Sequence, residues 1–165
     1  TIWDPPRTTM TEIRAFARRQ RATRKLHLLV VDYLGLIRPR DSRKQRYEQV
    51  QDDTGELKAL AKELGCPVLC LCQLNREADK DKPRLSHLRE SGSIEQDADC
   101  VLFLHRNKDK NLPELIIAKN RHGRTGFIEL DFSDRTTTFS ERIPEAAECR
   151  NYDSRFETYS QGDEF

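Results

Sequence analysis

Two short apolar runs constrain most strongly how this chain can fold. The first extends from Leu26 to Tyr33 and the second from Cys66 to Cys72. Continuous apolar runs of this length are typical of strands buried in a parallel sheet. Between them, residues 47–64 carry apolar side chains at helical spacings of three and four, and Gly65 follows as a stop. The order strand, helix, strand predicts an α/β fold.

A second helix is predicted before the first strand, from Thr9 to Lys25. Thr9 or Thr11 can cap it, with Glu12 in its first turn. Most of its surface is basic, which fits either a solvated face or a contact with phosphate or a partner protein. The predicted inward faces are Ile13, Phe16 and Ala17 in this helix, and Val50, Thr54, Leu57, Ala61 and Leu64 in the helix of residues 47–64.

The second half of the chain predicts a third strand of the α/β sheet, followed by an antiparallel hairpin. Cys100–His105 is a third apolar run, while Glu114–Lys119 and Gly126–Phe132 lie close enough in sequence to form a hairpin. Thr136–Phe139 can add an edge strand. We therefore expect parallel strands with crossover helices, extended by an antiparallel hairpin.

The connecting segments are predicted to be loops. Residues 37–46 are basic and predict an exposed loop, and residues 77–84 are charged and predict a mobile one. Residues 91–93 form a turn before a short helix around Ile94–Gln96, with Ser93 as its candidate N-cap.

Composition limits the class of protein. The 165 residues carry a net charge of +1, which argues against a polycationic nucleic-acid binder but not against a local basic surface. No apolar run approaches the ~20 residues needed to cross a membrane. The five cysteines are an odd number in mostly apolar surroundings, so we expect reduced, buried thiols in a cytoplasmic protein. Residues 1–140 are predicted to be structured, and residues 141–165 to form an acidic, disordered tail.

Two polar side chains follow the predicted parallel strands. Asp32 comes directly after the four apolar residues 28–31 of the first run, where a carboxylate can hold Mg²⁺ beside nucleotide phosphates. Gln73 ends the second strand, and its amide suits sensing a γ-phosphate or an attacking water. Ligands bind at the carboxyl ends of such strands, so we expect both side chains at one edge; the same rule singles out the segment after His105. The structural alternatives are an acid that caps the next element and an amide that ties down a loop.

Two further segments carry charge at turns. Residues 88–99 include Arg89, Ser91 and Gly92, a composition that suits contact with the phosphates of a DNA strand without base reading. The alternative there is a capped turn before a helix. The segment Lys119–Gly126 places cations at a hairpin tip, from which an arginine can reach a nucleotide on a neighbouring subunit. The alternative there is a solvated turn with solubilising charge.

Together, five ordered segments resemble the DnaB-type replicative helicases, which are RecA-like hexameric ATPases. These segments are Val30–Leu34, Leu57–Leu64, Gln73–Arg76, Leu88–Asp99 and Ala118–Gly126. The string from Arg89 to Asp99 is the most specific of them, and it disfavours a RecA-like recombinase. The resemblance implies a RecA-like P-loop NTPase core with ATP and Mg²⁺ as its ligands.

The resemblance also implies roles for residues at the nucleotide. Asp32 would be the Walker B acid near Mg²⁺, and Gln73 the amide that senses the γ-phosphate. Lys119 and Arg121 would be offered in trans to the ATP of the adjacent subunit.

A further set of implied properties concerns DNA and partners. Arg89, Glu90, Ser91 and Gly92 would form the loop that contacts the backbone of single-stranded DNA. The family further implies 5′ to 3′ translocation, a homo-hexamer, a primase and a helicase loader as partners, and a cytoplasmic location at the bacterial replication fork.

The sequence departs from the family in two informative ways. It contains no Gly-x-x-x-x-Gly-Lys-Ser/Thr phosphate loop, so we expect a partial core, the carboxyl-terminal part of the motor domain without its Walker A segment. We therefore also expect the isolated chain to be inactive. Asp53 stands where the family commonly has an apolar residue, which puts local packing in question. Smaller departures fall at Gly35, Cys72, His87, His122 and Arg124.

Two functions remain open on this basis. The chain is either part of an ATP-dependent replicative helicase or a stand-alone, non-catalytic module for DNA binding or helicase assembly. An in-frame phosphate loop encoded upstream of Thr1 would favour the helicase, and a start codon there would favour the module.

Overall fold

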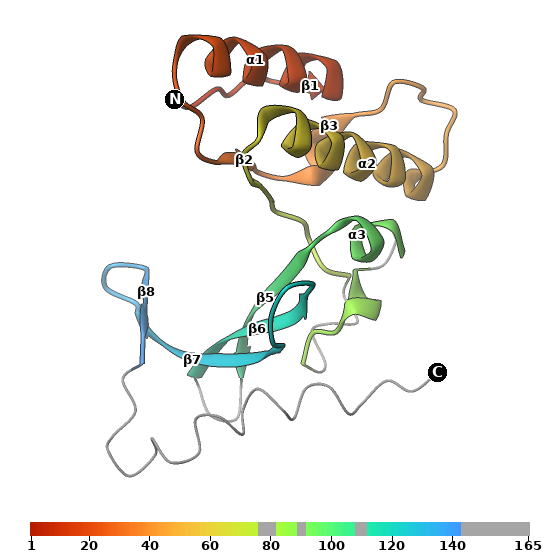
Figure 1. The fold of residues 1–165 in the computed structure, drawn as a ribbon. Helices are drawn as coiled ribbons and strands as arrows, with labels where there is room; N and C mark the ends of the chain where they lie inside the picture. The colour runs from red at the N-terminus through yellow and green to blue at the C-terminus, as the bar shows by residue number, and fades with distance from the viewer. Residues whose placement is uncertain (76–81, 89–91, 108–111, 143–165) are drawn as a thin grey trace. The chain divides into compact units, whose positions relative to one another are not determined.

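The computed structural model describes residues 1–75, 82–88, 92–107 and 112–142, which fall into two units (Figure 1). The first unit consists of Thr1–Asn75 and Ser86–Ala98, and the second of Arg76–Leu85 and Asp99–Phe165. Among the helices of the described ranges, none has the length and apolar character that a bilayer span requires.

Helix α1 spans Met10–Thr23 and begins at the predicted cap. Thr9 Oγ1 accepts a hydrogen bond from the Glu12 amide at 3.4 Å, and Glu12 Oε2 accepts one from the Thr9 amide at 2.8 Å. This reciprocal pair is a capping box, which satisfies two amides at the start of the helix. The hydrogen bonds from Thr9 lower the pKa of the Glu12 carboxyl.

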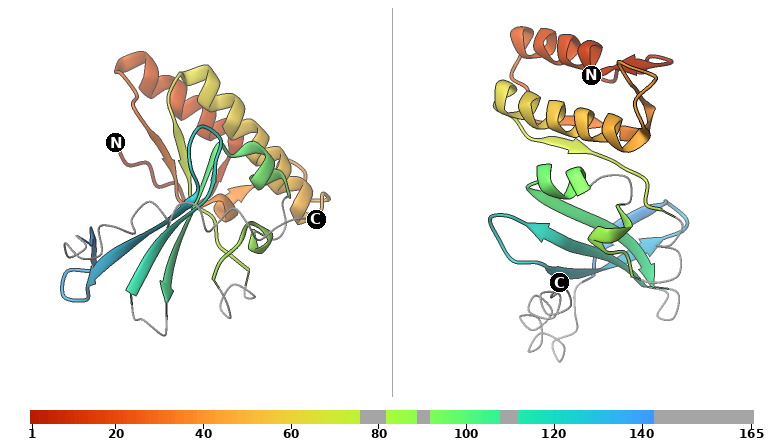
Figure 2. Two further views of the ribbon diagram at one scale, coloured as in Figure 1. Left: turned by 60° about the horizontal axis from the view of Figure 1, so that its bottom comes forward. Right: turned by 90° about the vertical axis from the view of Figure 1, so that its right-hand side faces the viewer.

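Helix α2, Arg46–Leu64, packs beside α1 (Figure 2). Arg14 Nη2 lies 3.1 Å from Glu56 Oε2, and Arg18 forms an ion pair with Glu63. Two arginines of the predicted basic face therefore pair with carboxylates of α2.

The inward face of α2 differs in part from the prediction. Val50, Leu57 and Leu64 are buried as expected, but Asp53 and Leu60 are buried with them. The helix ends at Gly65, whose φ of +60° and ψ of +35° are left-handed values that glycine adopts without a Cβ clash. The core of the first unit consists of Met10, Ile13, Ala17, Leu34, Ile37, Val50, Leu57, Leu60, Leu64 and Cys66.

Strands β2 (Leu29–Val31) and β4 (Val68–Cys70) form the parallel pair that the sequence predicts, with α2 as their crossover helix. They are shorter than the apolar runs, and only one face is buried. Leu29, Val31, Val68 and Cys70 pack against the core, whereas Val30 and Leu69, which are register partners, are 51% and 48% exposed. The prediction of fully buried strands is therefore wrong for one face, because side chains alternate across a strand and the core packs on one side.

The segment predicted as a loop from residue 37 is not entirely a loop. Ile37–Arg38 form strand β3, which pairs in parallel with β1, Thr8–Thr9. Ile37 is 3% exposed and belongs to the core. The prediction of an exposed loop is therefore wrong at Ile37, whose side chain is buried and whose backbone pairs with β1.

The second unit is an antiparallel sheet in the order β5-β6-β7-β8 (Figure 1). Its strands are β5 (Cys100–Asn107), β6 (Leu112–Asn120), β7 (Gly126–Ser133) and β8 (Thr138–Glu141). The β6–β7 hairpin and the edge strand are confirmed. The third apolar run is β5, but its predicted place beside the parallel strands is wrong, because its backbone pairs antiparallel with β6. Val101 and Phe103 of β5 are buried.

The side chain of Lys82 contacts two residues of this sheet. Lys82 Nζ lies 2.7 Å from Glu114 Oε2, as an ion pair without hydrogen-bond alignment, and 4.9 Å from the centre of the Phe127 ring. Glu114 is 2% exposed. The first part of the predicted mobile loop, residues 77–81, lies outside the described residues, whereas Lys82 is held by the sheet.

The prediction of buried thiols holds only in part. Cys66 is buried, but Cys72 and Cys100 are exposed, and all three are free, as is Cys70. Burial raises the pKa of Cys70 to about 12. Cys149 and the predicted tail from residue 143 onward lie outside the described residues.

Candidate functional site

Asp32 and Gln73 follow the carboxyl ends of the paired strands β2 and β4. Beyond the last register pair, the Leu71 amide donates to the Val31 carbonyl at 2.9 Å. The Leu34 amide then donates to the Leu71 carbonyl at 2.8 Å. These bonds hold the segments after both strands together, so the backbone brings Asp32 and Gln73 to one edge of the pair, as the sequence predicted.

Both side chains are available for a ligand. They are exposed, and neither makes a hydrogen bond or ion pair with any residue that the structure describes. The peptide bond after Asp32 is cis. The structural alternatives, a capping acid and a loop-tying amide, require bonds that these side chains do not make within the described ranges.

The side chains at this edge could contribute one carboxylate oxygen ligand to a metal ion. The described ranges hold no cluster of three or more histidine, cysteine or acidic side chains arranged for a metal. Mg²⁺ at nucleotide sites commonly uses one or two carboxylates with waters and substrate phosphates. The single uncommitted carboxylate of Asp32 fits that pattern. Partial desolvation by the surrounding protein raises the pKa of the Cys72 thiol next to Gln73, although the residue is exposed, and this favours the neutral thiol.

The predicted DNA-contact loop is only partly visible. Arg89, Glu90 and Ser91 lie outside the described residues, and Gly92 is the first residue of helix α3, Gly92–Asp97. Ser93 lies within this helix, so its prediction as the N-cap is wrong.

The chain on both sides of the loop is anchored within the first unit. Before it, the Asn75 amide donates to the His87 carbonyl at 3.2 Å. After it, Thr54 Oγ1 of α2 donates to Asp97 Oδ2 of α3 at 2.7 Å. The first contact joins His87 to the strand-end segment, two residues beyond Gln73. The chain before the loop is thus held next to the carboxyl end of β4, and the chain after the loop is held by α2.

Lys119 and Arg121 belong to the second unit, at the end of β6 and at the hairpin tip. Lys119 is half-buried and stands opposite Val101 in the register of β5 and β6. Arg121 is exposed and forms an ion pair with Asp99, at 2.8 Å between Nη1 and Oδ1. The four predicted nucleotide residues therefore fall as two pairs in two different units.

Sequence reasoning assigned no role to Asp99. It lies 22 residues before Arg121, in a string attributed as a whole to DNA contact. The antiparallel pairing of the third apolar run with the hairpin strand is the signal that could have linked the two positions. That pairing decides which residue faces Arg121.

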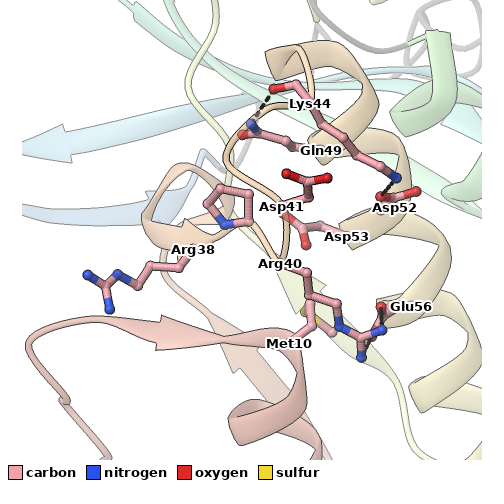
Figure 3. Close-up of a pocket in the computed structure, with 10 residues that line it drawn as sticks. Met10, Arg38, Arg40, Asp41, Lys44, Gln49, Asp52, Asp53 and Glu56 are labelled. Carbon is pink, nitrogen blue, oxygen red and sulfur yellow. Dashed lines mark hydrogen bonds and ion pairs between the residues drawn. The ribbon is translucent and has the colours of Figure 1, made fainter.

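A separate cleft of about 280 Å³ opens in the first unit, and it contains none of the predicted site residues (Figure 3). Most of its charges pair with each other, including Lys44 with Asp52 and Arg40 with Glu56. Asp53 also borders the cleft, although it is 7% exposed and its Oδ2 has no hydrogen-bond partner in the described part of the chain. Burial raises the pKa of Asp53 to about 6. The remaining lining residues are Met10, Arg38, Pro39, Asp41 and Gln49.

Sequence comparisons with known proteins identify the family to which this chain is similar. The family model of the DnaB-like helicase C terminal domain matches residues 1–141. The replicative DNA helicase DnaB of Treponema pallidum (strain Nichols) is 42% identical over 143 residues, which are 87% of this chain and 33% of the relative. That of Geobacillus stearothermophilus is 44% identical over 142 residues, covering 79% and 31%. The chain thus spans about a third of the length of these curated relatives.

Solved structures give the same result for the fold. A solved ATPase domain superposes with a TM-score of 0.81 at 32% identity, over 87% of this chain and 55% of that one. A DnaB-like replicative helicase, studied with its interactions with primase, gives a TM-score of 0.80 at 32% identity, over 87% and 37%. The predicted α/β, RecA-like fold class, with parallel strands, a crossover helix and an antiparallel hairpin, is confirmed. The chain belongs to the family of DnaB-like helicase C-terminal domains.

Proposed function

We propose that this chain is the carboxyl-terminal part of the motor domain of an ATP-dependent replicative DNA helicase. The observation that carries the proposal is the pair of uncommitted polar side chains, Asp32 and Gln73, at the adjoining carboxyl ends of β2 and β4. Open α/β sheets bind ligands at this position. Membership of the family gives the ligand its chemistry, ATP with Mg²⁺.

In this proposal, each residue at the strand ends has a separate task. Asp32 would help to hold Mg²⁺ beside the phosphates, and the bound ion would supply neutralisation of phosphate charge. Gln73 donates through its amide to the γ-phosphate or orients the attacking water. Gln73 lies two residues before Asn75, so a change at the phosphate reaches the anchor of the DNA-contact loop through a short stretch of chain.

Lys119 and Arg121 supply cations to ATP bound by the neighbouring subunit. A cation that stabilises the transition state from outside its own subunit requires assembly, which supports a homo-hexamer as the working form. Arg121 is half-exposed at a hairpin tip, where a neighbour can be reached. In this way hydrolysis would depend on the interface between subunits.

The DNA contact in this proposal belongs to the loop of Arg89, Glu90, Ser91 and Gly92. Its anchors, next to the strand-end segment and on α2, support a coupling between the nucleotide and the loop. We extend the proposal to 5′ to 3′ translocation on single-stranded DNA, to contacts with primase and a helicase loader, and to action in the cytoplasm at the replication fork.

A mixed-subunit experiment in the full-length helicase tests the proposal. Arg121→Ala is expected to lower ATPase kcat by about 10³-fold, because an arginine finger contributes that much or more. Asp32→Asn homo-hexamers should also be inactive. Mixing the two variants should restore activity at about one interface in four, where an intact Asp32 faces an intact Arg121.

The control is Arg135→Ala, which removes an equally charged, exposed side chain from the β7–β8 turn and should leave kcat unchanged. Size-exclusion chromatography must show hexamers for every variant. Wild-type turnover of Arg121→Ala, or no recovery in the mixture, would exclude the trans role.

The alternative is a non-catalytic DNA-binding or helicase-assembly module. The coding sequence upstream of Thr1 discriminates directly: an in-frame phosphate loop supports the motor, and a start codon supports the module.

A further inference from the structure

The guanidinium of Arg121 is held by a carboxylate of its own chain. Arg121 Nη1 lies 2.8 Å from Asp99 Oδ1, in an ion pair whose side chains are 47% and 50% exposed. At 2.8 Å, with a charged donor and a charged acceptor, this is a strong hydrogen bond. Its exposure means that another molecule can approach both partners.

The backbones of the same two residues are also joined. The Arg121 amide donates to the Asp99 carbonyl at 2.8 Å, one step beyond the register pair of Cys100 with Asn120. The β5–β6 ladder thus fixes the Cα of Arg121 relative to Asp99. With both backbone and side chain fixed, the arginine has little freedom left in its rotamers.

The hairpin tip around Arg121 is built to keep this geometry. Asn120 Nδ2 donates to the Arg124 carbonyl at 3.3 Å, and the Gly123 amide donates to the Asn120 carbonyl at 3.4 Å. A Cβ on Gly123 would lie 2.6 Å from Asn120 Nδ2, so a side chain there would displace the Asn120 amide. The turn is a closed unit that presents Arg121 in one direction.

We propose that Asp99 is a positioning residue for Arg121, which orients its guanidinium toward the nucleotide of the neighbouring subunit. This inference rests on the proposed trans role of Arg121. A guanidinium is a planar fork of five N–H donors, so a carboxylate can hold one edge while another edge faces a phosphate. Holding the fork in advance removes an ordering cost that would otherwise fall on the transition state.

Asp99 also lies close in the chain to the proposed DNA-contact loop. It lies two residues after the end of α3, whose first residue belongs to the proposed DNA loop. The residue that aims the arginine is therefore joined by a short covalent path to the segment that contacts DNA.

The test uses single-stranded DNA-stimulated ATPase of the full-length hexamer. Asp99→Ala should lower kcat by about 10-fold or more and leave the KM for ATP within about 2-fold, since only the transition-state contact is misplaced. Asp99→Asn keeps an acceptor oxygen but loses the charge, so it should lower kcat by about 3-fold. Asp134→Ala, an exposed aspartate in the β7–β8 turn, is the matched control and should match wild type.

A double variant separates positioning from general structure. If Asp99 acts through Arg121, then Asp99→Ala should cause no further loss in the Arg121→Ala background. The melting temperature of Asp99→Ala should stay within about 3 °C of wild type, because a half-exposed ion pair contributes little stability.

The outcomes are distinguishable. A loss of activity in Arg121→Ala with wild-type kcat in Asp99→Ala overturns this inference and leaves the proposed function standing. Multiplicative losses in the double variant, or a rise in kcat of Asp99→Ala, also overturn it. Wild-type kcat in Arg121→Ala overturns the proposed trans role itself, and this inference with it.

Discussion

At the residue scale, Asp53 shows how a buried acid is tolerated at a cost. Its position on α2 turns inward, where the resemblance would place an apolar side chain, and its Oδ2 has no hydrogen-bond partner in the described ranges. Burial raises its pKa from 3.8 to about 6, against the lowering influence of Arg46. The folded protein therefore keeps this proton at pH values where the unfolded chain has lost it.

We expect stability to reflect this difference in proton binding. Between about pH 4 and pH 7 the folded state binds the additional proton, so the contribution of Asp53 to stability should fall as pH rises. Relative to Asp53→Asn, the wild type should lose about 2 kcal/mol of unfolding free energy over this interval. Urea unfolding followed by circular dichroism at several pH values measures it.

The control for this prediction is Asp52→Asn. Asp52 is the next residue on α2, but it is exposed and paired with Lys44. Its variant should show a pH dependence parallel to wild type. Parallel curves for Asp53→Asn as well would mean that the Asp53 carboxyl titrates normally.

At the element scale, local signals set where the helices begin and end. Thr9, one of the two caps predicted for α1, and Gly65, the predicted stop of α2, both lie where predicted. They were predictable because each is satisfied by neighbours within a few residues. The Ser93 cap was wrong because helix α3 begins earlier, at Gly92.

Alanine substitutions at two glycines, one inside α2 and one at its end, should change the stability of the protein in opposite directions. Gly65→Ala should destabilise the protein by about 1 kcal/mol, because a Cβ is strained at a φ of +60°. Gly55→Ala, in the helix interior with open space around its Cβ, should stabilise it by about 0.5–1 kcal/mol. Thermal unfolding compares both variants with wild type, and equal signs would contradict the assignment of Gly65 as the helix stop.

At the scale of the whole molecule, the phosphate-binding apparatus is incomplete within these residues. Asp32 and Gln73 offer a carboxylate and an amide, but a phosphate loop supplies most backbone contacts to a nucleotide. The 165 residues contain no such loop, and the chain spans only 33% of a curated relative. Under the proposed function, we therefore expect these 165 residues by themselves not to bind ATP.

This expectation can be measured directly. The isolated chain should show no ATP binding by calorimetry up to about 1 mM nucleotide with Mg²⁺, since it lacks the phosphate cradle. The full-length helicase is the positive control under the same conditions. Micromolar affinity in the isolated chain would show that the strand-end residues suffice for binding.

The sequence by itself determined the local features of this protein. The start of α1, the end of α2 and the β6–β7 hairpin follow from caps and turns, which are properties of short segments, and the strand-helix-strand order also predicted the parallel pair β2–β4. Only the tertiary structure decided which side chains meet across long separations. Asp53 is buried on the inward face of α2, and Arg14 and Arg18 of the basic face form ion pairs with α2. Asp99 forms an ion pair with Arg121. The physical reason is that these outcomes depend on which elements pack or pair, and neither helix rotation nor strand register is encoded in a short stretch of sequence.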